Sequence, residues 1–165
     1  QKMKVKDLCA GFDSVSSCLS KGLGTPAGTL LLGRKEFIGR AHRARKMLGG
    51  GMRQAGVIAA AGIYALENNV ERLKDDHANA QRLADGLRKA GYDVSGPNTN
   101  MVLVKVDQPQ ALAERLKKES IMVLPRSPMR PVTHLDVDAA GIDRVVAAFS
   151  QLRTPAPARD TARAR

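Results

Sequence analysis

The sequence is poor in aromatic residues and cysteine, and it has no long apolar run. Tryptophan is absent, and aromatic residues make up 3% of the 165 positions, which leaves little material for stacking nucleic-acid bases. The two cysteines, Cys9 and Cys18, lack the spacing and the partners of a zinc site or a disulfide framework. No segment approaches the roughly 18 apolar residues of a membrane span, and none resembles a secretory signal. We therefore expect reduced thiols, a cytoplasmic location and no membrane partner.

Acidic residues are outnumbered by basic ones, and the formal net charge is +11. Clustered Lys and Arg would bind nucleic-acid phosphates and release their counterions. The basic residues of this chain are instead spread over many predicted helices, where they suit a solvated face. Among them are Arg34, Arg40, Arg43, Arg45, Lys46, Arg72, Lys74, Arg88, Lys89, Lys117 and Lys118. We expect no nucleic-acid partner, and a nucleic-acid-binding domain stays as a minority alternative.

The first part of the chain predicts two short strands around a glycine loop. Residues 12–19 are rich in β-favouring types without a helical period, which indicates a short buried strand. Residues 21–28 contain three glycines and a proline and predict a loop, and residues 29–32 predict a second apolar strand. This order places Lys21 at the end of a strand.

Three helices are expected to follow the strands. A basic helix over residues 34–47 should end at the triple glycine 49–51, and an alanine-rich, nearly buried helix should cover residues 53–67. Asn69 is a candidate cap for the next helix, which Gly91 should end. Residues 1–91 supply too few strands to close a sheet, so they resemble the end of a larger α/β domain.

Residues 92–152 predict a small α/β domain of their own. Strands are expected at 101–106, 121–124 and 131–135, with helices at 110–119 and 139–152, in the order strand, helix, strand, strand, helix. Residues 153–165 contain almost nothing that could be buried, and we expect a disordered basic tail there.

Lys21 is the clearest candidate for a residue with a chemical role. A lysine held out of water between a buried strand and a glycine loop loses its preference for the ammonium form. A deprotonated lysine can attack an aldehyde and form a Schiff base. Most lysines beside glycine loops are nonetheless solvated, so the local pattern alone favours an ordinary surface residue.

Several separated motifs strengthen the case for Lys21. The segment Cys18-Leu19-Ser20-Lys21-Gly22-Leu23-Gly24-Thr25-Pro26-Ala27-Gly28 resembles the cofactor-lysine segment of the low-specificity L-threonine aldolases, within the β-eliminating lyase group. Further resemblance follows in the same order along the chain. It lies in residues 45–54 with the triple glycine, in residues 59–66, in Thr99-Asn100-Met101, and in Arg130 with Val132-Thr133-His134-Leu135-Asp136.

The resemblance implies the C-terminal half of a pyridoxal-phosphate (PLP) enzyme of fold type I. Residues 1–91 would be the end of the PLP-binding large domain with its connecting helices, and residues 92–152 the small C-terminal α/β domain. The implied reaction is the cleavage of L-threonine or L-allo-threonine to glycine and acetaldehyde, and Lys21 would bind PLP as a Schiff base. Arg130 corresponds to the arginine that binds the carboxylate of the amino acid substrate, a role suited to a planar guanidinium.

Other assignments also depend on the resemblance. Lys46 and Arg53 flank the glycine turn and correspond to basic residues that reach the cofactor phosphate across a subunit interface. His134 is more simply explained as a structural residue of a strand. Relatives of this kind assemble as homodimers or homotetramers, and we expect the same of the complete enzyme.

The family's carboxylate for the pyridine nitrogen, its ring-stacking group and its phosphate turn have no counterparts in this sequence. We therefore expect the isolated chain to be inactive and poorly folded in its first half. Two alternatives to threonine cleavage stay open. One is another PLP lyase of the same fold, such as a β-eliminating enzyme or a racemase, and the other is a non-catalytic remnant that acts as an interaction module.

Overall fold

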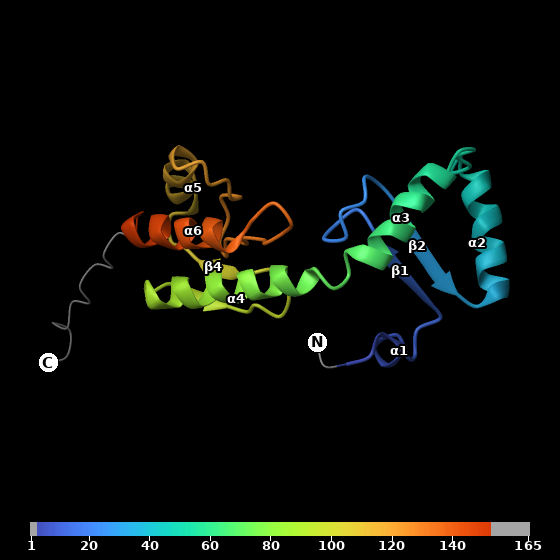
Figure 1. Ribbon diagram of the computed structural model, residues 1–165, viewed down its shortest axis with the longest axis horizontal. Coiled ribbons are helices and arrows are strands. Elements are labelled where there is room, and N and C mark those ends of the chain that lie inside the picture. The colour runs from blue at the N-terminus through green and yellow to red at the C-terminus, as the bar shows by residue number, and fades with distance from the viewer. Residues whose placement is uncertain (1–2, 153–165) are drawn as a thin grey trace, which may run out of the picture. The chain divides into compact units, whose positions relative to one another are not determined.

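The computed structural model describes residues 3–152, which form two compact units (Figure 1). The first unit extends to Asp75, and the second begins at Asp76. No helix in the described part of the chain is long and apolar enough to cross a membrane. The tail predicted at residues 153–165 lies outside the described residues.

The first unit contains an antiparallel hairpin after a short helix, α1 (Val5–Leu8). Strand β1 (Ser14–Cys18) pairs along its whole length with β2 (Thr29–Gly33). The two predicted strands are therefore confirmed, but the predicted burial of the first is wrong, since only Val15 of β1 is partly buried. The apolar residues of β2 are also exposed. Leu30, Leu31 and Leu32 are 40%, 46% and 49% exposed. The physical reason is that successive side chains point to opposite faces, and neither face of this two-stranded sheet is fully covered by the described residues.

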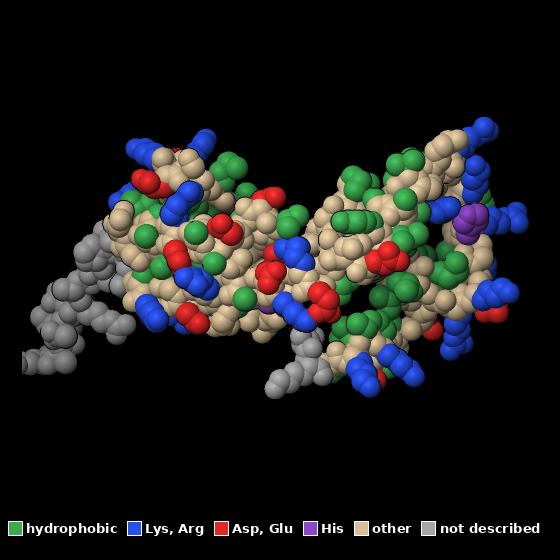
Figure 2. All heavy atoms as spheres, in the orientation of Figure 1, with side chains coloured by type: hydrophobic (Ala, Val, Ile, Leu, Met, Phe, Trp, Pro, Cys, Tyr) green, Lys and Arg blue, Asp and Glu red, His purple; other side chains and the backbone are tan. Residues whose placement is uncertain are grey.

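Helix α2 (Lys35–Met47) follows β2 and carries the basic surface of this unit (Figure 2). The acidic Glu36 lies in its first turn and basic residues lie in its last, an order that complements the helix dipole. The helix ends as predicted at the triple glycine. Gly49 has a φ of +85°, and the N–H groups of Gly49 and Gly50 donate to the carbonyls of Lys46 (3.2 Å) and Arg45 (2.8 Å). This pair of bonds is a Schellman motif, which requires a left-handed residue such as glycine at this position.

Helix α3 (Gly56–Asn68) completes the first unit. Its alanine-rich sequence led us to expect a nearly buried helix. The structure shows burial only at Gly62 and Ala65, whereas Ile63 and Tyr64 are 58% and 65% exposed. The prediction of near-complete burial is wrong because the hairpin covers only one narrow side of this helix.

Helix α4 (Leu73–Lys89) supplies the core of the second unit. Leu83 and Leu87 are almost fully buried there, together with Ala80 and Ala84. The division between the two compact units therefore lies near the start of α4. The end of the large domain expected at residue 91 stays a prediction.

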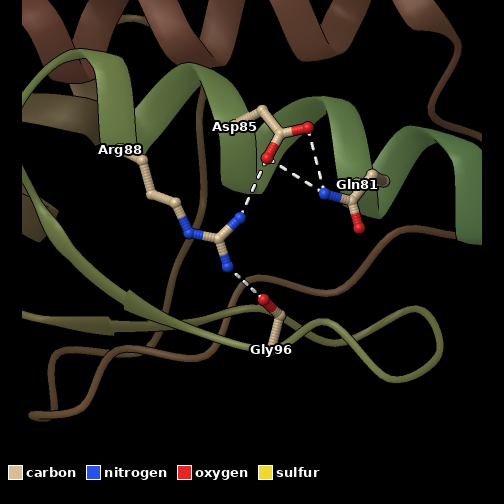
Figure 3. A network of polar contacts seen from close by, with 4 residues as sticks. All are labelled: Gln81, Asp85, Arg88 and Gly96. Atoms are coloured by element: carbon tan, nitrogen blue, oxygen red, sulfur yellow. Dashed lines mark hydrogen bonds and ion pairs between the residues drawn. The ribbon is translucent and has the colours of Figure 1, made fainter.

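The C-terminal end of α4 has the predicted glycine stop. The N–H of Gly91 donates to the Arg88 carbonyl (2.8 Å) and that of Tyr92 to the Leu87 carbonyl (3.0 Å). Arg88 also contacts Asp85 (2.9 Å) and donates to the carbonyl of Gly96, which ties the helix to the segment after β3 (Figure 3). Hydrogen bonds from Gln81 and then from Arg88 lower the pKa of the Asp85 carboxyl.

The strands of the second unit are shorter than predicted. β3 (Asp93–Ser95) was not predicted, and it pairs antiparallel with β4 (Leu103–Lys105). No strand forms at 121–124, and the strand expected at 131–135 is reduced to a single bridge from Val132 to Met101. A second bridge joins Met129, between the two expected strands, to Val104. Prolines at 125, 128 and 131 lack the N–H that a continuous ladder needs.

Two helices close the second unit. α5 (Pro109–Lys118) begins with a proline in its first turn, and α6 (Ala139–Leu152) is capped by Asp138, whose carboxylate accepts the Gly141 N–H (2.7 Å). Phe149 of α6 is fully buried and meets the Tyr92 ring edge-on at 5.5 Å. The remaining core residues are Ala80, Leu83, Ala84, Leu87, Val102, Val104, Leu112, Leu116, Ile121, Met129, Ile142 and Ala148.

Gly86 marks a point where α4 and α6 lie very close, and it yields a stability prediction. A Cβ there would stand 2.5 Å from Cγ2 and 3.2 Å from Cβ of Val146. We expect Gly86→Ala to lower the free energy of unfolding by about 1–3 kcal/mol through overpacking. Gly39→Ala is the control, because a Cβ at Gly39 meets nothing within 4 Å and should stabilise α2 by about 0.5–1 kcal/mol. Thermal unfolding followed by circular dichroism tests both variants. An equal increase in the stability of the two would contradict the packing argument.

Candidate active site

The candidate site is built on the loop that joins β1 to β2. Leu19 follows β1 directly and is 4% exposed, and its N–H donates to the Gly28 carbonyl (3.0 Å) across the base of the loop. Side chains of α3 pack on this base. A Cβ on Gly62 would lie 3.0 Å from Leu19 Cδ1, and one on Gly28 would lie 3.3 Å from Ile58 Cγ2. The loop therefore starts and ends against one helix.

Lys21 lies on a tight turn inside this loop. The N–H of Gly24 donates to the Lys21 carbonyl (2.9 Å), and Gly24 has a φ of +75°, which favours glycine. The predicted position after a strand end is correct, and Lys21 is exposed, as the local pattern alone favoured. The neighbouring Gly22 and Leu23 are half-buried, so the exposure is confined to Lys21 and not shared by the residues that follow it.

The rest of the loop is better ordered than its glycine content suggests. Thr25 is 8% exposed, its N–H donates to the Leu19 carbonyl (3.4 Å), and its hydroxyl donates to the Ala27 carbonyl (3.3 Å). Buried polar groups are stable when hydrogen-bonded. Thr25 therefore fixes the second half of the loop.

Two side chains that the sequence analysis did not assign to the site hold the first half of the loop. Asn69 donates through Nδ2 to the Leu23 carbonyl (2.7 Å), and Arg72 donates through Nη2 to the Gly22 carbonyl (3.1 Å). Asn69 was expected to cap the following helix, but it ends α3 and α4 begins only at Leu73. The prediction was wrong because a capping residue is recognised from local spacing, whereas this amide finds its partner 46 positions away.

Cys18 lies immediately before the loop, with Sγ 3.4 Å from the Ser20 hydroxyl. Hydrogen bonding to Ser20, through its hydroxyl and then its backbone, lowers the pKa of the Cys18 thiol, and the nearby charge of Lys21 acts in the same direction. The thiol is exposed. It is an accessible nucleophile three positions from the candidate cofactor lysine.

Lys46 and Arg53 flank the glycine turn of the same unit. A Cβ on Gly51 would stand 2.6 Å from Lys46 Nζ, so this lysine folds back over the turn. Arg53 is exposed. In the described part of the chain, neither side chain forms a hydrogen bond or an ion pair with Lys21. Their role toward a cofactor phosphate stays a prediction.

Arg130 belongs to the second unit. It follows the fully buried Met129, which exchanges two backbone hydrogen bonds of 2.8 Å with Val104. This anchored neighbour fixes the backbone at Arg130, whose side chain is exposed. An exposed guanidinium on a rigid segment is available for a carboxylate.

His134 borders a hollow of about 620 Å³ in the second unit, which Ile121, Val137 and Ile142 also line. Its Nδ1 accepts the Asp136 N–H (3.3 Å) and lies 3.4 Å from the Asp136 carboxylate. The expected strand does not form at this position, so His134 belongs to an irregular segment. Its contacts are local, and a structural role for it stays a prediction.

Comparison with known proteins identifies relatives of this chain. The family model "Beta-eliminating lyase" matches residues 1–109. The low specificity L-threonine aldolase of Escherichia coli (strain K12) is 49% identical over 146 residues, which are 87% of this chain and 44% of that protein. Low-specificity L-threonine aldolase 1 of Arabidopsis thaliana is 38% identical over 157 residues, again 44% of its length. The chain thus spans less than half the length of these curated relatives.

Solved structures show the same fold. Serine palmitoyltransferase of Sphingomonas wittichii matches with a TM-score of 0.68 at 18% identity, over 88% of this chain and 40% of that one. A serine palmitoyltransferase variant from S. paucimobilis with a bound PLP–myriocin compound matches with a TM-score of 0.66 at 20% identity, over 88% of this chain and 39% of that one. The likeness confirms the predicted fold class, an α/β chain of the PLP fold-type I architecture.

The family match covers more than half of the chain, and it includes the hairpin, the lysine loop and the glycine turn described above. The fold agrees with it independently. This chain belongs to the beta-eliminating lyase family.

Proposed function

We propose that this chain serves a PLP-dependent lyase that cleaves L-threonine or L-allo-threonine to glycine and acetaldehyde. The observation that carries the proposal is the position of Lys21, on a turn closed by Gly24 at the end of β1. The 49% identity to the E. coli threonine aldolase supports the choice of reaction. The reaction would serve threonine breakdown and glycine formation in the cytoplasm, and the complete enzyme would be a homodimer or homotetramer.

The residues of the lysine loop fit an aldehyde-bearing cofactor. Lys21 presents an exposed primary amine that forms no ion pair in the described part of the chain. Lys21 would hold PLP through this amine. When bound, PLP supplies an electron-withdrawing ring that weakens the bonds at the substrate Cα.

The other assigned residues would bind the negatively charged groups of the substrate and the cofactor. Arg130 would bind the substrate carboxylate through two parallel N–H groups and thereby orient the bond to be cleaved. Lys46 and Arg53 would bind the cofactor phosphate, because an ammonium and a guanidinium both suit phosphate oxygens. The Lys46 side chain folds back over Gly51, so its amine lies beside the backbone of the glycine turn.

Covalent capture of PLP provides the first test. The chain is mixed with PLP and reduced with borohydride, so that the amine nitrogen bonds to the aldehyde carbon, water leaves, and hydride reduces the C=N bond to a stable amine. Peptide mass spectrometry should find the label mainly on Lys21, and Lys21→Ala should remove it. Lys35→Ala, at the exposed start of α2, is the matched control and should leave it unchanged. Label spread evenly over the surface lysines would contradict the cofactor assignment.

The reaction itself is tested in a chimera in which this chain replaces the matching part of the E. coli relative. We expect L-threonine cleavage, measured as acetaldehyde release, and its loss in Lys21→Arg. Arg130→Lys should lower kcat/KM roughly ten- to hundredfold, as expected for the loss of one charge-assisted hydrogen bond of about 1.5–3 kcal/mol. Arg126→Lys, another exposed arginine of the same segment, is the control. A chimera that processes serine or β-substituted alanines but not threonine would indicate a different lyase of this family.

A further inference from the structure

The peptide groups that follow Lys21 are held by side chains from the connection between α3 and α4. Asn69 donates to the Leu23 carbonyl at 2.7 Å, and Arg72 donates to the Gly22 carbonyl at 3.1 Å. The donors lie 46 and 50 positions further along the chain. Two consecutive carbonyls of the loop are therefore fixed from outside the loop.

The loop by itself supplies little restraint on Lys21. Its turn is closed by one backbone bond, from the Gly24 N–H to the Lys21 carbonyl. Gly22 and Leu23, the two central residues of this turn, make their side-chain-to-backbone hydrogen bonds with Arg72 and Asn69. Both acceptor residues are half-buried, so these bonds are less open to competition from water than bonds on an exposed loop.

The residues before and after Lys21 both contact helix α3 or the residue at its end. Before Lys21, Leu19 packs against Gly62 of α3. After Lys21, Leu23 is bound by Asn69, the residue that ends α3. The helix thereby fixes the chain two residues before and two residues after the lysine, although it does not contact the lysine side chain.

We propose that Asn69 and Arg72 are positioning residues for Lys21, which fix the turn that presents its amine to an aldehyde cofactor. The inference rests on the proposed role of Lys21 and adds two residues to the site. Neither residue touches the cofactor in this proposal. They act through the backbone of Gly22 and Leu23.

Hydrogen exchange of the whole chain tests the restraint without any cofactor. Asn69→Asp keeps the shape of the side chain but removes its donor. It should speed exchange of the Gly24 N–H about fivefold, as expected for the loss of one ordinary hydrogen bond. Asn68→Ala is the matched control, because the Asn68 amide donates to the Tyr64 carbonyl of its own helix (2.8 Å). Unchanged exchange in Asn69→Asp would overturn the proposal.

Capture of PLP at Lys21 then tests positioning. Borohydride-trapped label at Lys21 should fall about fivefold in Asn69→Asp and stay unchanged in Asn68→Ala. Arg72→Lys, which keeps the charge but not the planar guanidinium, should give an intermediate loss. Label at Lys35 serves as the internal reference for the overall extent of labelling.

The outcomes separate this inference from the proposed function. If Asn69→Asp speeds exchange of the Gly24 N–H but leaves PLP capture at Lys21 unchanged, Asn69 orders the turn without positioning the amine. That result would overturn this inference but not the proposed function. If Lys21 of the unchanged chain captures no PLP, the proposed function fails. In that case the exchange of Gly24 and the rate of reductive methylation of Lys21 by formaldehyde decide whether Asn69 positions this amine.

Discussion

The contact of α3 with the base of the β1–β2 loop is the constraint on which the candidate site depends. Leu19 is buried against Gly62, where the absence of a side chain allows the close approach. This contact fixes the start of the loop against α3, whose C-terminal end then lies close to the second part of the loop. Asn69 consequently reaches the Leu23 carbonyl. One apolar contact and one amide therefore fix the backbone on both sides of Lys21.

The two units differ in how much of their apolar surface is buried. The second unit has a continuous core around Phe149, Leu87 and Leu116, all fully buried. In the first unit, three consecutive leucines of β2 are exposed. Successive side chains of a strand point to opposite faces, so such a run is typical of strands that are covered on both faces in α/β proteins. The chemistry assigned to Lys21 thus lies in the unit with the smaller core.

Much of the fold and part of the site could be predicted from the sequence. The loop carrying Lys21, the helices and the glycine stops at Gly49 and Gly91 all follow local rules, and the structure confirms them. The strands near Pro131 were overestimated, because single bridges and full ladders have similar sequence patterns. Asn69 was assigned to a cap, because its true acceptor is distant in sequence.

The sequence by itself determined the order of the long helices, the family and the position of Lys21 on a glycine turn, since these depend on neighbouring residues and on separated motifs in a fixed order. Only the tertiary structure decided which surfaces are buried, that α4 belongs to the second unit, and that Asn69 and Arg72 hold the turn after Lys21. Burial and long-range hydrogen bonds depend on which segments meet in space. Local periodicity in the sequence carries no information about such tertiary contacts.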